Sequence, residues 1–245
     1  MQRSNYYSFV FISIITVVCA GLLSVTSMAL KPRQELNEIV EMKKNILKAV
    51  GIIDNQTKMS QDEILSVFNR SIESRIVNRN GESVILPDGI SIDNIDPELE
   101  EQKNPDQQYL PVYIQKINGE IASCCVPIFG KGLWSTIYGY LALENDLKTI
   151  KGVTFYKHGE TPGLGAEIVA DWFTENFKGK KIFDKEGKLT SVKILKGKAL
   201  ESSPDFAHKV DGISGATKTC DGVNIFLLKD LEKYERFFIN NRASN

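Results

Sequence analysis

The stretch Asp211-Gly212-Ile213-Ser214-Gly215-Ala216-Thr217-Lys218-Thr219 is the most informative part of this chain. The small residues before Thr217 leave its hydroxyl on an open, flexible backbone, which a bulky phosphate can approach closely. The alternative is a plain turn that enters a helix, since the amphipathic pattern of Val223–Ile239 follows. A catalytic serine is not supported, because Ser214 does not stand in the G-x-S-x-G context of a nucleophile elbow.

The N-terminal segment predicts a membrane anchor. No Asp, Glu, Lys or Arg occurs from Ser4 to Leu30, and about 20 apolar residues suffice to span a bilayer. We therefore expect residues 1–31 to form a retained transmembrane helix, with residues 6–30 in contact with lipid. The alternative is a signal peptide cleaved near Ser27-Met28-Ala29, but signal peptides carry an apolar region of only about 7–15 residues.

The charges that flank this span leave its orientation open. Arg3 precedes the span, whereas Lys31, Arg33, Lys43 and Lys44 follow it. This count alone places the C-terminal part in the cytoplasm, but long domains cross membranes largely regardless of such charges.

Beyond the anchor, the sequence predicts a helical stalk over residues 32–58 and one soluble domain over residues 59–245. Strand and helix patterns are interspersed without regular β-α-β spacing, so we expect an α+β domain with a mixed sheet. Strands are expected at 75–77, 84–86, 112–114, 121–126, 133–143, 153–156 and 192–195, and helices at 33–50, 166–177 and 223–239.

Short local patterns mark where several of these elements begin and turn. Ser60-Gln61-Asp62-Glu63 has the spacing of a capping box that opens a short helix. The dipeptides Asn80-Gly81 and Asn118-Gly119 predict two hairpin turns. The polar, acidic segment from Asp88 to Gln108 is expected to be a long surface excursion.

The composition argues against a nucleic-acid partner. The 245 residues are 42% hydrophobic and 25% charged, with a net charge of −1, and nucleic-acid binding requires a basic surface. Two histidines make a metal site improbable, so we expect none. The cysteines form neither a C-x-x-C pair nor a spaced disulfide framework, and buried apolar roles are expected for Cys124 and Cys125.

A second glycine-rich segment is His158-Gly159-Glu160-Thr161-Pro162-Gly163-Leu164-Gly165-Ala166-Glu167. It reads as a constrained loop after a strand, and such loops present backbone N–H groups that favour anionic ligands. A structural turn is an equally good reading, and neither G-x-G-x-x-G nor Walker A spacing is present. Asp211 either orients the Ser214 hydroxyl, binds magnesium or caps a turn, and Trp134 is expected in the core.

Taken together, these segments resemble the C subunit of the Na+-translocating NADH:quinone oxidoreductase. The resemblance covers nearly the whole chain, and its two most specific parts are the glycine-rich loop at 159–165 and the stretch 208–217. Shorter matches are the N-terminal span, Lys44-Asn45-Ile46-Leu47, Phe68-Asn69-Arg70-Ser71-Ile72-Glu73, Val126-Pro127-Ile128 and Gly132-Leu133-Trp134-Ser135.

The resemblance implies that FMN is held covalently, through its phosphate, on the Thr217 oxygen. The residues that it implies for FMN binding are Ser214, Gly215, Ala216, Glu160, Thr161, Gly163, Leu164 and Gly165, with Asp211 in the flavinylation motif. The family pattern after the acceptor is typically Thr-Leu-Thr-Ser, whereas this chain has Thr217-Lys218-Thr219-Cys220. Lys218 either alters recognition by the attaching enzyme or lies near the flavin phosphate.

The resemblance also implies a location and partners. It places a single-pass subunit in the bacterial inner membrane, with the flavin domain in the periplasm and facing other subunits of the complex. A flavin transferase that uses FAD attaches the flavin, which relays electrons from an iron–sulfur centre towards the flavin of the B subunit. The alternatives are the G subunit of the related Rnf complex and, in a different class, an anchored extracytoplasmic ligand-binding module.

Overall fold

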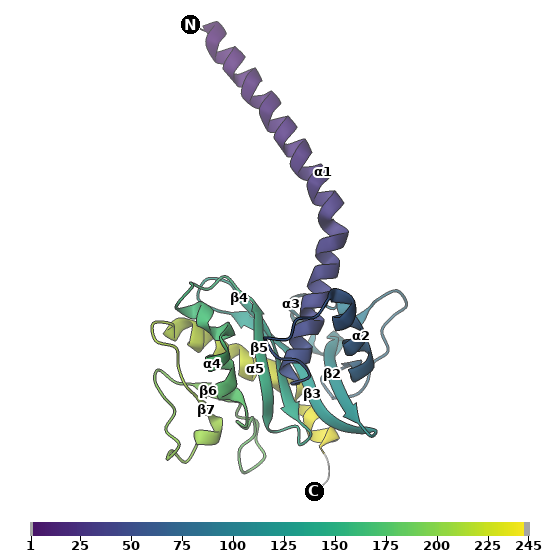
Figure 1. The fold of residues 1–245 in the computed structure, drawn as a ribbon, viewed down its shortest axis with the longest axis vertical. Helices are drawn as coiled ribbons and strands as arrows, with labels where there is room; N and C mark the ends of the chain where they lie inside the picture. Colours follow the sequence, from purple (N-terminus) through teal and green to yellow (C-terminus); the bar gives the residue numbers. More distant parts are fainter. Residues whose placement is uncertain (1, 243–245) are drawn as a thin grey trace. The chain divides into compact units, whose positions relative to one another are not determined.

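The computed structural model describes residues 2–242 and divides the chain into two compact units, Met1–Met42 and Lys43–Asn245. The helix α1 (Gln2–Ala49) is labelled in Figure 1. From Tyr6 onward it is long and apolar enough to cross a membrane. The Ser13 and Thr16 hydroxyls of this helix each donate to the carbonyl oxygen four residues earlier at 2.9 Å.

The last residues of α1 belong to the globular unit. Ile46 and Leu47 are fully buried, and a Cβ at Gly152 would lie only 2.5 Å from the Ala49 carbonyl oxygen. The end of α1 therefore packs closely against the sheet strand that contains Gly152. The globular unit begins at Lys43, earlier than the predicted start at residue 59, and the helix ends short of the predicted end of the stalk at residue 58.

Five strands form an antiparallel sheet in sequence order. They are β1 (Ile72–Val77), β2 (Leu110–Ile117), β3 (Glu120–Lys131), β4 (Thr136–Glu144) and β5 (Ile150–Lys157). Short connections from β2 onward reverse the chain each time, which gives antiparallel pairing. Parallel pairing occurs separately, between β6 (Lys193–Ile194) and β7 (Lys209–Val210). The α+β class is confirmed, with the two kinds of pairing in two sheets rather than in one mixed sheet.

Both predicted Asn-Gly turns are present, but only one joins two full strands. Asn118 and Gly119 have φ angles of 55° and 86° and connect β2 to β3. At the other turn, Gly81 has a φ of 78°, but the pairing beyond β1 is limited to one bridge between Val77 and Ser83. The expected strand at 84–86 is therefore wrong.

The predicted capping box is confirmed at the start of α2 (Gln61–Ser71). The Ser60 hydroxyl accepts from the Glu63 N–H at 3.4 Å, and the Glu63 carboxylate accepts from the Ser60 N–H at 2.7 Å. Two backbone donors at the helix start are thus satisfied by local side chains. The helix buries Ile64 and Phe68 beneath it.

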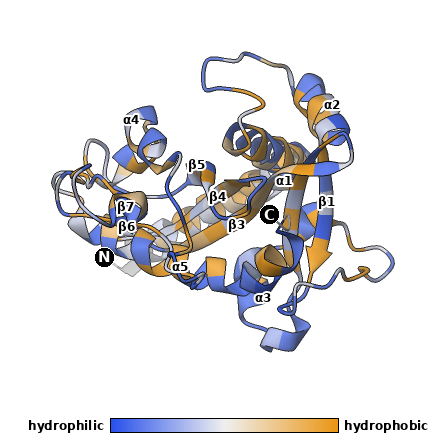
Figure 2. Cartoon of the chain, turned by 90° about the horizontal axis from the view of Figure 1, so that it is seen from below, coloured by the Kyte–Doolittle hydropathy of each residue, from blue (hydrophilic) through white to orange (hydrophobic). Residues whose placement is uncertain are grey.

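The segment 88–108 contains three short helices where the sequence gives no regular pattern. They are η1 (Ile92–Asn94), α3 (Pro97–Glu101) and η2 (Pro105–Gln107). Although α3 is strongly hydrophilic (Figure 2), it is docked on the domain. Glu98 accepts a hydrogen bond from the Tyr138 hydroxyl, and Glu101 pairs with Lys229 at 2.8 Å.

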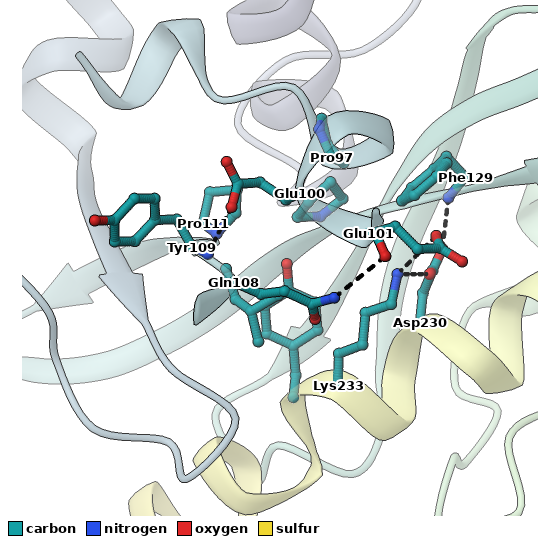
Figure 3. A pocket seen from close by; sticks show the side chains of 12 residues that line it. Pro97, Glu100, Glu101, Gln108, Tyr109, Pro111, Phe129, Asp230 and Lys233 are labelled. Carbon is teal, nitrogen blue, oxygen red and sulfur yellow. Dashed lines mark hydrogen bonds and ion pairs between the residues drawn. The ribbon is translucent and has the colours of Figure 1, made fainter. Parts of the chain in front are cut away.

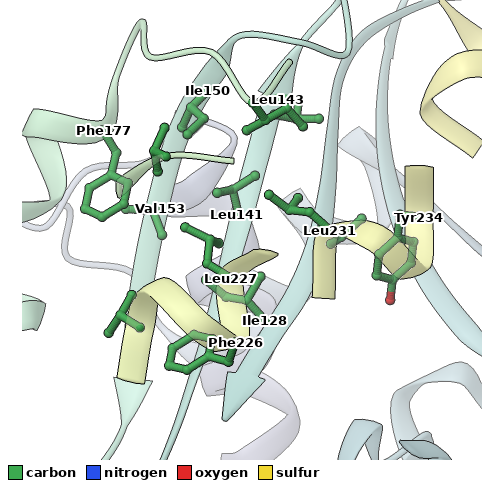
Figure 4. Packing of buried hydrophobic residues seen from close by; sticks show 14 of the residues in the cluster. Ile128, Leu141, Leu143, Ile150, Val153, Phe177, Phe226, Leu227, Leu231 and Tyr234 are labelled. Atoms are coloured by element: carbon green, nitrogen blue, oxygen red, sulfur yellow. The ribbon is translucent and has the colours of Figure 1, made fainter. Parts of the chain in front are cut away.

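The long helix α5 (Thr217–Asn241) covers one face of the sheet (Figures 1 and 4). Its apolar side chains, including Phe226 and Leu227, pack with Ile128 and Leu141 of the central strands. A Cβ at Gly130 would lie 2.2 Å from the Phe226 Cβ, so glycine there allows the helix to approach. Because α5 begins at Thr217, it includes the predicted helix 223–239 and extends it at both ends.

Three further expectations need correction. The strand expected at 133–143 begins only at Thr136, and the helix expected at 166–177 is split into η3 (Gly165–Val169), α4 (Asp171–Thr174) and η4 (Glu175–Phe177). The split occurs because Ala170 has extended backbone angles, φ −71° and ψ 142°. The strand expected at 192–195 is only the short β6, which is followed by η5 (Phe206–His208). Cys124 and Cys125 are buried, as expected.

Candidate functional site

Thr217 is the first residue of α5, and the start of that helix lacks a side-chain cap. The N-cap residue is Ala216, which is buried and makes no capping hydrogen bond. Ser214 and Gly215 before it are exposed, and Gly215 has a φ of 75°. Backbone N–H groups in an uncapped first turn remain available, and the helix dipole adds an attraction for anions at that end. The half-buried Thr217 therefore stands where a phosphate is stabilised.

The backbone before Thr217 is held in place by close contacts with the loop that follows β6. A Cβ at Gly212 would lie 1.9 Å from the Leu195 carbonyl oxygen, and the Gly212 N–H donates to the Gly197 carbonyl at 2.8 Å. The Asp211 carboxylate accepts from the Ala199 N–H at 2.7 Å. This bond joins Asp211 to the loop that follows β6, and its role in flavin attachment stays a prediction.

The two glycine-rich segments lie close together in the structure. A Cβ at Gly215 would lie 2.7 Å from the Leu164 side chain, so glycine lets the loop at 158–167 approach the segment before Thr217. Gly163 has a φ of 73° with open space beside it. The Thr161 carbonyl accepts from the Leu164 N–H at 3.1 Å, which closes the loop, and Thr161 itself is exposed.

Glu160 lies beneath this loop and joins it to two other segments. Its side chain is buried, at 5% exposure, and its carboxylate accepts from the Thr219 hydroxyl at 2.6 Å. It also accepts from the Trp134 N–H at 3.0 Å and the Leu133 N–H at 3.3 Å. Burial alone raises the pKa of Glu160, but these hydrogen bonds outweigh it, so the pKa lies below its usual value.

A third loop, Gly132–Ser135, completes the site, and its role is not apparent from sequence reasoning. It is a tight turn in which the Gly132 N–H donates to the Ser135 carbonyl at 2.8 Å. Trp134 is 70% exposed and Leu133 is 47% exposed, so the expectation that Trp134 lies in the core is wrong. The turn lifts both side chains out of the sheet before β4 begins. The sequence signal for this turn is the run Gly-Leu-Trp-Ser itself, because it interrupts the strand pattern on either side.

These loops form an apolar rim around the start of α5. The backbone N–H groups of Leu133 and Trp134 bond to Glu160, and the Leu164 side chain lies against Gly215. Gly165 is buried below, where a Cβ would lie 2.6 Å from the Thr219 hydroxyl oxygen. Exposed large apolar side chains near an uncapped helix start suit a flat, partly apolar ligand that carries a phosphate.

The residues after Thr217 differ sharply in environment. Lys218 is exposed to solvent, whereas Thr219 and Cys220 are buried. Burial raises the pKa of the Cys220 thiol, which suits an apolar packing role. Of the two histidines, His208 interacts with the Lys181 carbonyl at 2.7 Å and His158 accepts from the Glu160 N–H at 3.3 Å. No cluster that could hold a metal is found among residues 2–242.

A second polar group lies farther along α5, around Asp230 and Lys233 (Figure 3). The Asp230 carboxylate is fully buried and pairs with Lys233 at 2.7 Å, while Lys233 also pairs with Glu101 at 3.1 Å. Asp230 further accepts from the Phe129 N–H at 2.6 Å. Each charge faces an internal partner, so this cluster joins α3, β3 and α5 rather than presenting groups to a ligand.

Comparison with known proteins gives a consistent result. The family described as "FMN-binding domain" matches residues 132–229, a range that includes all three loops. The C subunit of the Na(+)-translocating NADH-quinone reductase of Pseudomonas aeruginosa is 32% identical, over 92% of this chain and 91% of that protein. The corresponding C subunit of Neisseria meningitidis serogroup B is 35% identical, over 85% of this chain and 83% of that protein.

Two solved structures share the fold. The crystal structure of the Na(+)-translocating NADH-quinone reductase C subunit from Parabacteroides distasonis has a TM-score of 0.73 and 32% identity, and covers 88% of this chain and 98% of that one. The crystal structure of Shewanella oneidensis NqrC has a TM-score of 0.67 and 31% identity, with coverage of 84% and 98%.

Proposed function

Because the chain belongs to the family of the C subunits of Na+-translocating NADH-quinone reductases, we propose that it carries FMN as a phosphoester on Thr217. Membership makes it a subunit of an oxidoreductase complex with an FMN-binding domain and an apolar N-terminal helix. The covalent linkage, the relay of electrons and the periplasmic side are our proposals.

The observation that carries the proposal is the position of Thr217 at the uncapped start of α5. Thr217 is half-buried and follows the exposed Ser214 and Gly215, so a phosphate attached there meets no bulky side chain from that segment. The free N–H groups of the first turn and the helix dipole then stabilise its negative charge. The residues present therefore fit a phosphate-linked flavin.

The remaining residues supply shape and orientation. Leu133, Trp134 and Leu164 offer the exposed apolar surface against which an isoalloxazine ring can lie, while Thr161 and Gly163 border the same space. When bound, a flavin accepts electrons one or two at a time, so it can connect one-electron centres. We propose that the subunit uses this property to pass electrons from an iron–sulfur centre to the flavin of another subunit.

Attachment requires a separate enzyme, and the chemistry is balanced if FAD is the donor. The Thr217 oxygen forms a bond to the phosphorus of the FMN half while the pyrophosphate bond breaks. AMP leaves, and the hydroxyl proton is released. In the periplasm an ester keeps a cofactor that simple dissociation would otherwise lose.

We propose that residues 6–30 contact lipid and that the other subunits of the complex are the remaining partners.

In-gel fluorescence tests the linkage. The full-length protein is co-expressed with a competent flavin transferase, denatured and examined under ultraviolet light. We expect a flavin band from the wild type and none from Thr217→Ala, whereas Thr190→Ala, which removes another exposed threonine hydroxyl, keeps the band. A wild type without the band, or a Thr217→Ala variant that retains it, would refute the proposal.

The same experiment separates the main alternatives. A ligand-binding module without a covalent flavin gives no band under these conditions. A reporter fused to the C-terminus tests the location, and we expect activity of a periplasmic reporter. Activity of a cytoplasmic reporter instead would contradict the proposed orientation. No observation in the structure favours the G subunit of the Rnf complex over the family that the comparisons identify.

A further inference from the structure

Glu160 carries a buried negative charge that is balanced by neutral donors. Its carboxylate oxygens accept from the Thr219 hydroxyl and from the backbone N–H groups of Leu133 and Trp134. Among the ion pairs of residues 2–242, no Lys, Arg or His side chain pairs with it within 4.0 Å. Since the hydrogen bonds keep its pKa low, the group is ionised at neutral pH.

The surrounding backbone is shaped to receive this charge. A Cβ at Gly132 would lie 2.6 Å from one Glu160 carboxylate oxygen, and a Cβ at Gly165 would lie 2.8 Å from the other. Glycine on both sides lets two loops approach the carboxylate closely. A solvated surface glutamate would need neither glycine, so the local sequence is adapted to a charge held in one position.

The Glu160 charge lies between the loop Gly132–Ser135 and the first turn of α5, the two segments that it joins by hydrogen bonds. One oxygen bonds to the N–H of Trp134, whose ring is exposed at the rim, and the other bonds to Thr219, two residues after Thr217. A fixed negative charge in a partly buried site disfavours any process that adds negative charge nearby, because the low-dielectric surroundings screen it weakly. Reduction of a flavin adds negative charge at the ring.

We propose that Glu160 is a positioning residue that also lowers the reduction potential of the flavin on Thr217. Its role in this proposal depends on its fixed charge and on the three hydrogen bonds that hold it in place. It aligns the loop Gly132–Ser135 with the start of α5 and contributes its charge to the site between them. This inference rests on the proposed attachment of FMN to Thr217.

The test is the midpoint potential of the full-length, flavin-loaded protein, measured by spectroelectrochemical titration at constant pH. Glu160→Gln removes the charge with little change in size. We expect its equilibrium constant for one-electron reduction to increase about tenfold, which corresponds to about 59 mV. Glu167→Gln is the matched control, because Glu167 lies in the same segment but bonds outward to the Trp172 ring N–H, and its potential should equal that of the wild type.

Two further variants separate charge from position. Glu160→Asp keeps the charge but shortens the side chain, and Thr219→Val removes the 2.6 Å hydrogen bond while leaving the carboxylate. Both should keep the potential at or below the wild-type value. A rise in either variant comparable to that of Glu160→Gln would show a purely positional effect and would overturn the charge role.

The outcomes also distinguish this inference from the proposed function. A flavin band in Glu160→Gln together with an unchanged potential overturns the inference and leaves Thr217 as the attachment site. A wild type without a flavin band refutes the proposed function itself. If Glu160→Gln does not fold, as judged by circular dichroism, the charge-retaining variants Glu160→Asp and Thr219→Val decide the matter, because a raised potential in either one is incompatible with the proposal.

Discussion

The buried pair formed by Asp230 and Lys233 gives the most sharply defined prediction about stability (Figure 3). Their charged atoms lie 2.7 Å apart, and the two side chains are 1% and 6% exposed. Replacing Lys233 by Met leaves the Asp230 carboxylate buried with the Phe129 N–H, while Lys229 stands 3.9 Å away. Removing one partner of a buried ion pair costs about 3–5 kcal/mol. The remaining bond to Phe129 favours the lower end of that range.

A double-mutant cycle isolates the interaction. Asp230→Asn keeps an oxygen for the Phe129 N–H and leaves Lys233 with Glu101, so we expect a smaller loss, about 2 kcal/mol. In Asp230→Asn/Lys233→Met no unpaired charge remains, and the loss should be only about 1 kcal/mol. The double variant should thus be more stable than Lys233→Met alone. The free energy of unfolding is measured by urea denaturation of the full-length protein in detergent, followed by near-ultraviolet circular dichroism.

The pH dependence of Lys233→Met provides an independent check. Burial raises the pKa of Asp230 to about 6, although Lys233 counteracts this rise. A carboxyl group with a raised pKa in the folded state stabilises at low pH, and this contribution is lost as the pH rises through the folded pKa. Without Lys233 the pKa of Asp230 rises further. Relative to the wild type, Lys233→Met should therefore lose less free energy of unfolding at pH 5 than at pH 8.

Two results would refute this reasoning. The first is a Lys233→Met variant within about 1 kcal/mol of the wild type at pH 8, where a buried carboxylate that has lost its main partner costs more than that. The second is a double variant whose loss equals the combined losses of the single variants, since independent sites add and coupled sites do not.

Three further predictions concern the scaffold, and each is measured by urea denaturation of the full-length protein. Ser60→Ala removes the hydroxyl of the capping box with Glu63 and should lower the free energy of unfolding by about 1 kcal/mol; no change would contradict the role of the cap. Gly152→Ala places a Cβ 2.5 Å from the Ala49 carbonyl oxygen and should cost about 1–3 kcal/mol through overpacking. Asn118→Val puts a β-branched residue at a φ of 55°, so we expect a loss, whereas Asn118→Gly should be tolerated because glycine adopts that conformation freely.

Features that depend on neighbouring residues follow from the sequence. The Ser60–Glu63 box forms at the start of α2, and the Asn118-Gly119 turn joins β2 to β3. Each rests on contacts between residues a few positions apart, so the local pattern contains the needed information. The split of the expected helix at Ala170 has no such local signal, and it illustrates how tertiary packing overrides the pattern.

The candidate site also has parts that the local sequence predicts and parts that depend on tertiary packing. The segment around Thr217 and the loop at 158–167 stand out by their small residues, and the structure brings them together. The turn at Trp134 and the buried position of Glu160 were not predicted, because both depend on which other segments lie beside them. Glu160 meets Thr219 across 59 positions of sequence, and no periodicity in a single segment encodes that meeting.

The sequence by itself therefore determined the apolar N-terminal helix, the α+β class and the positions of the two glycine-rich loops of the candidate site. These follow from composition, from turn residues and from the order of local patterns along the chain. The tertiary structure alone decided that Thr217 begins an uncapped helix, that Trp134 is exposed and that Glu160 is a buried charge. The physical reason is that burial and hydrogen bonding between distant segments depend on how the whole chain packs, while turns and caps depend only on their neighbours.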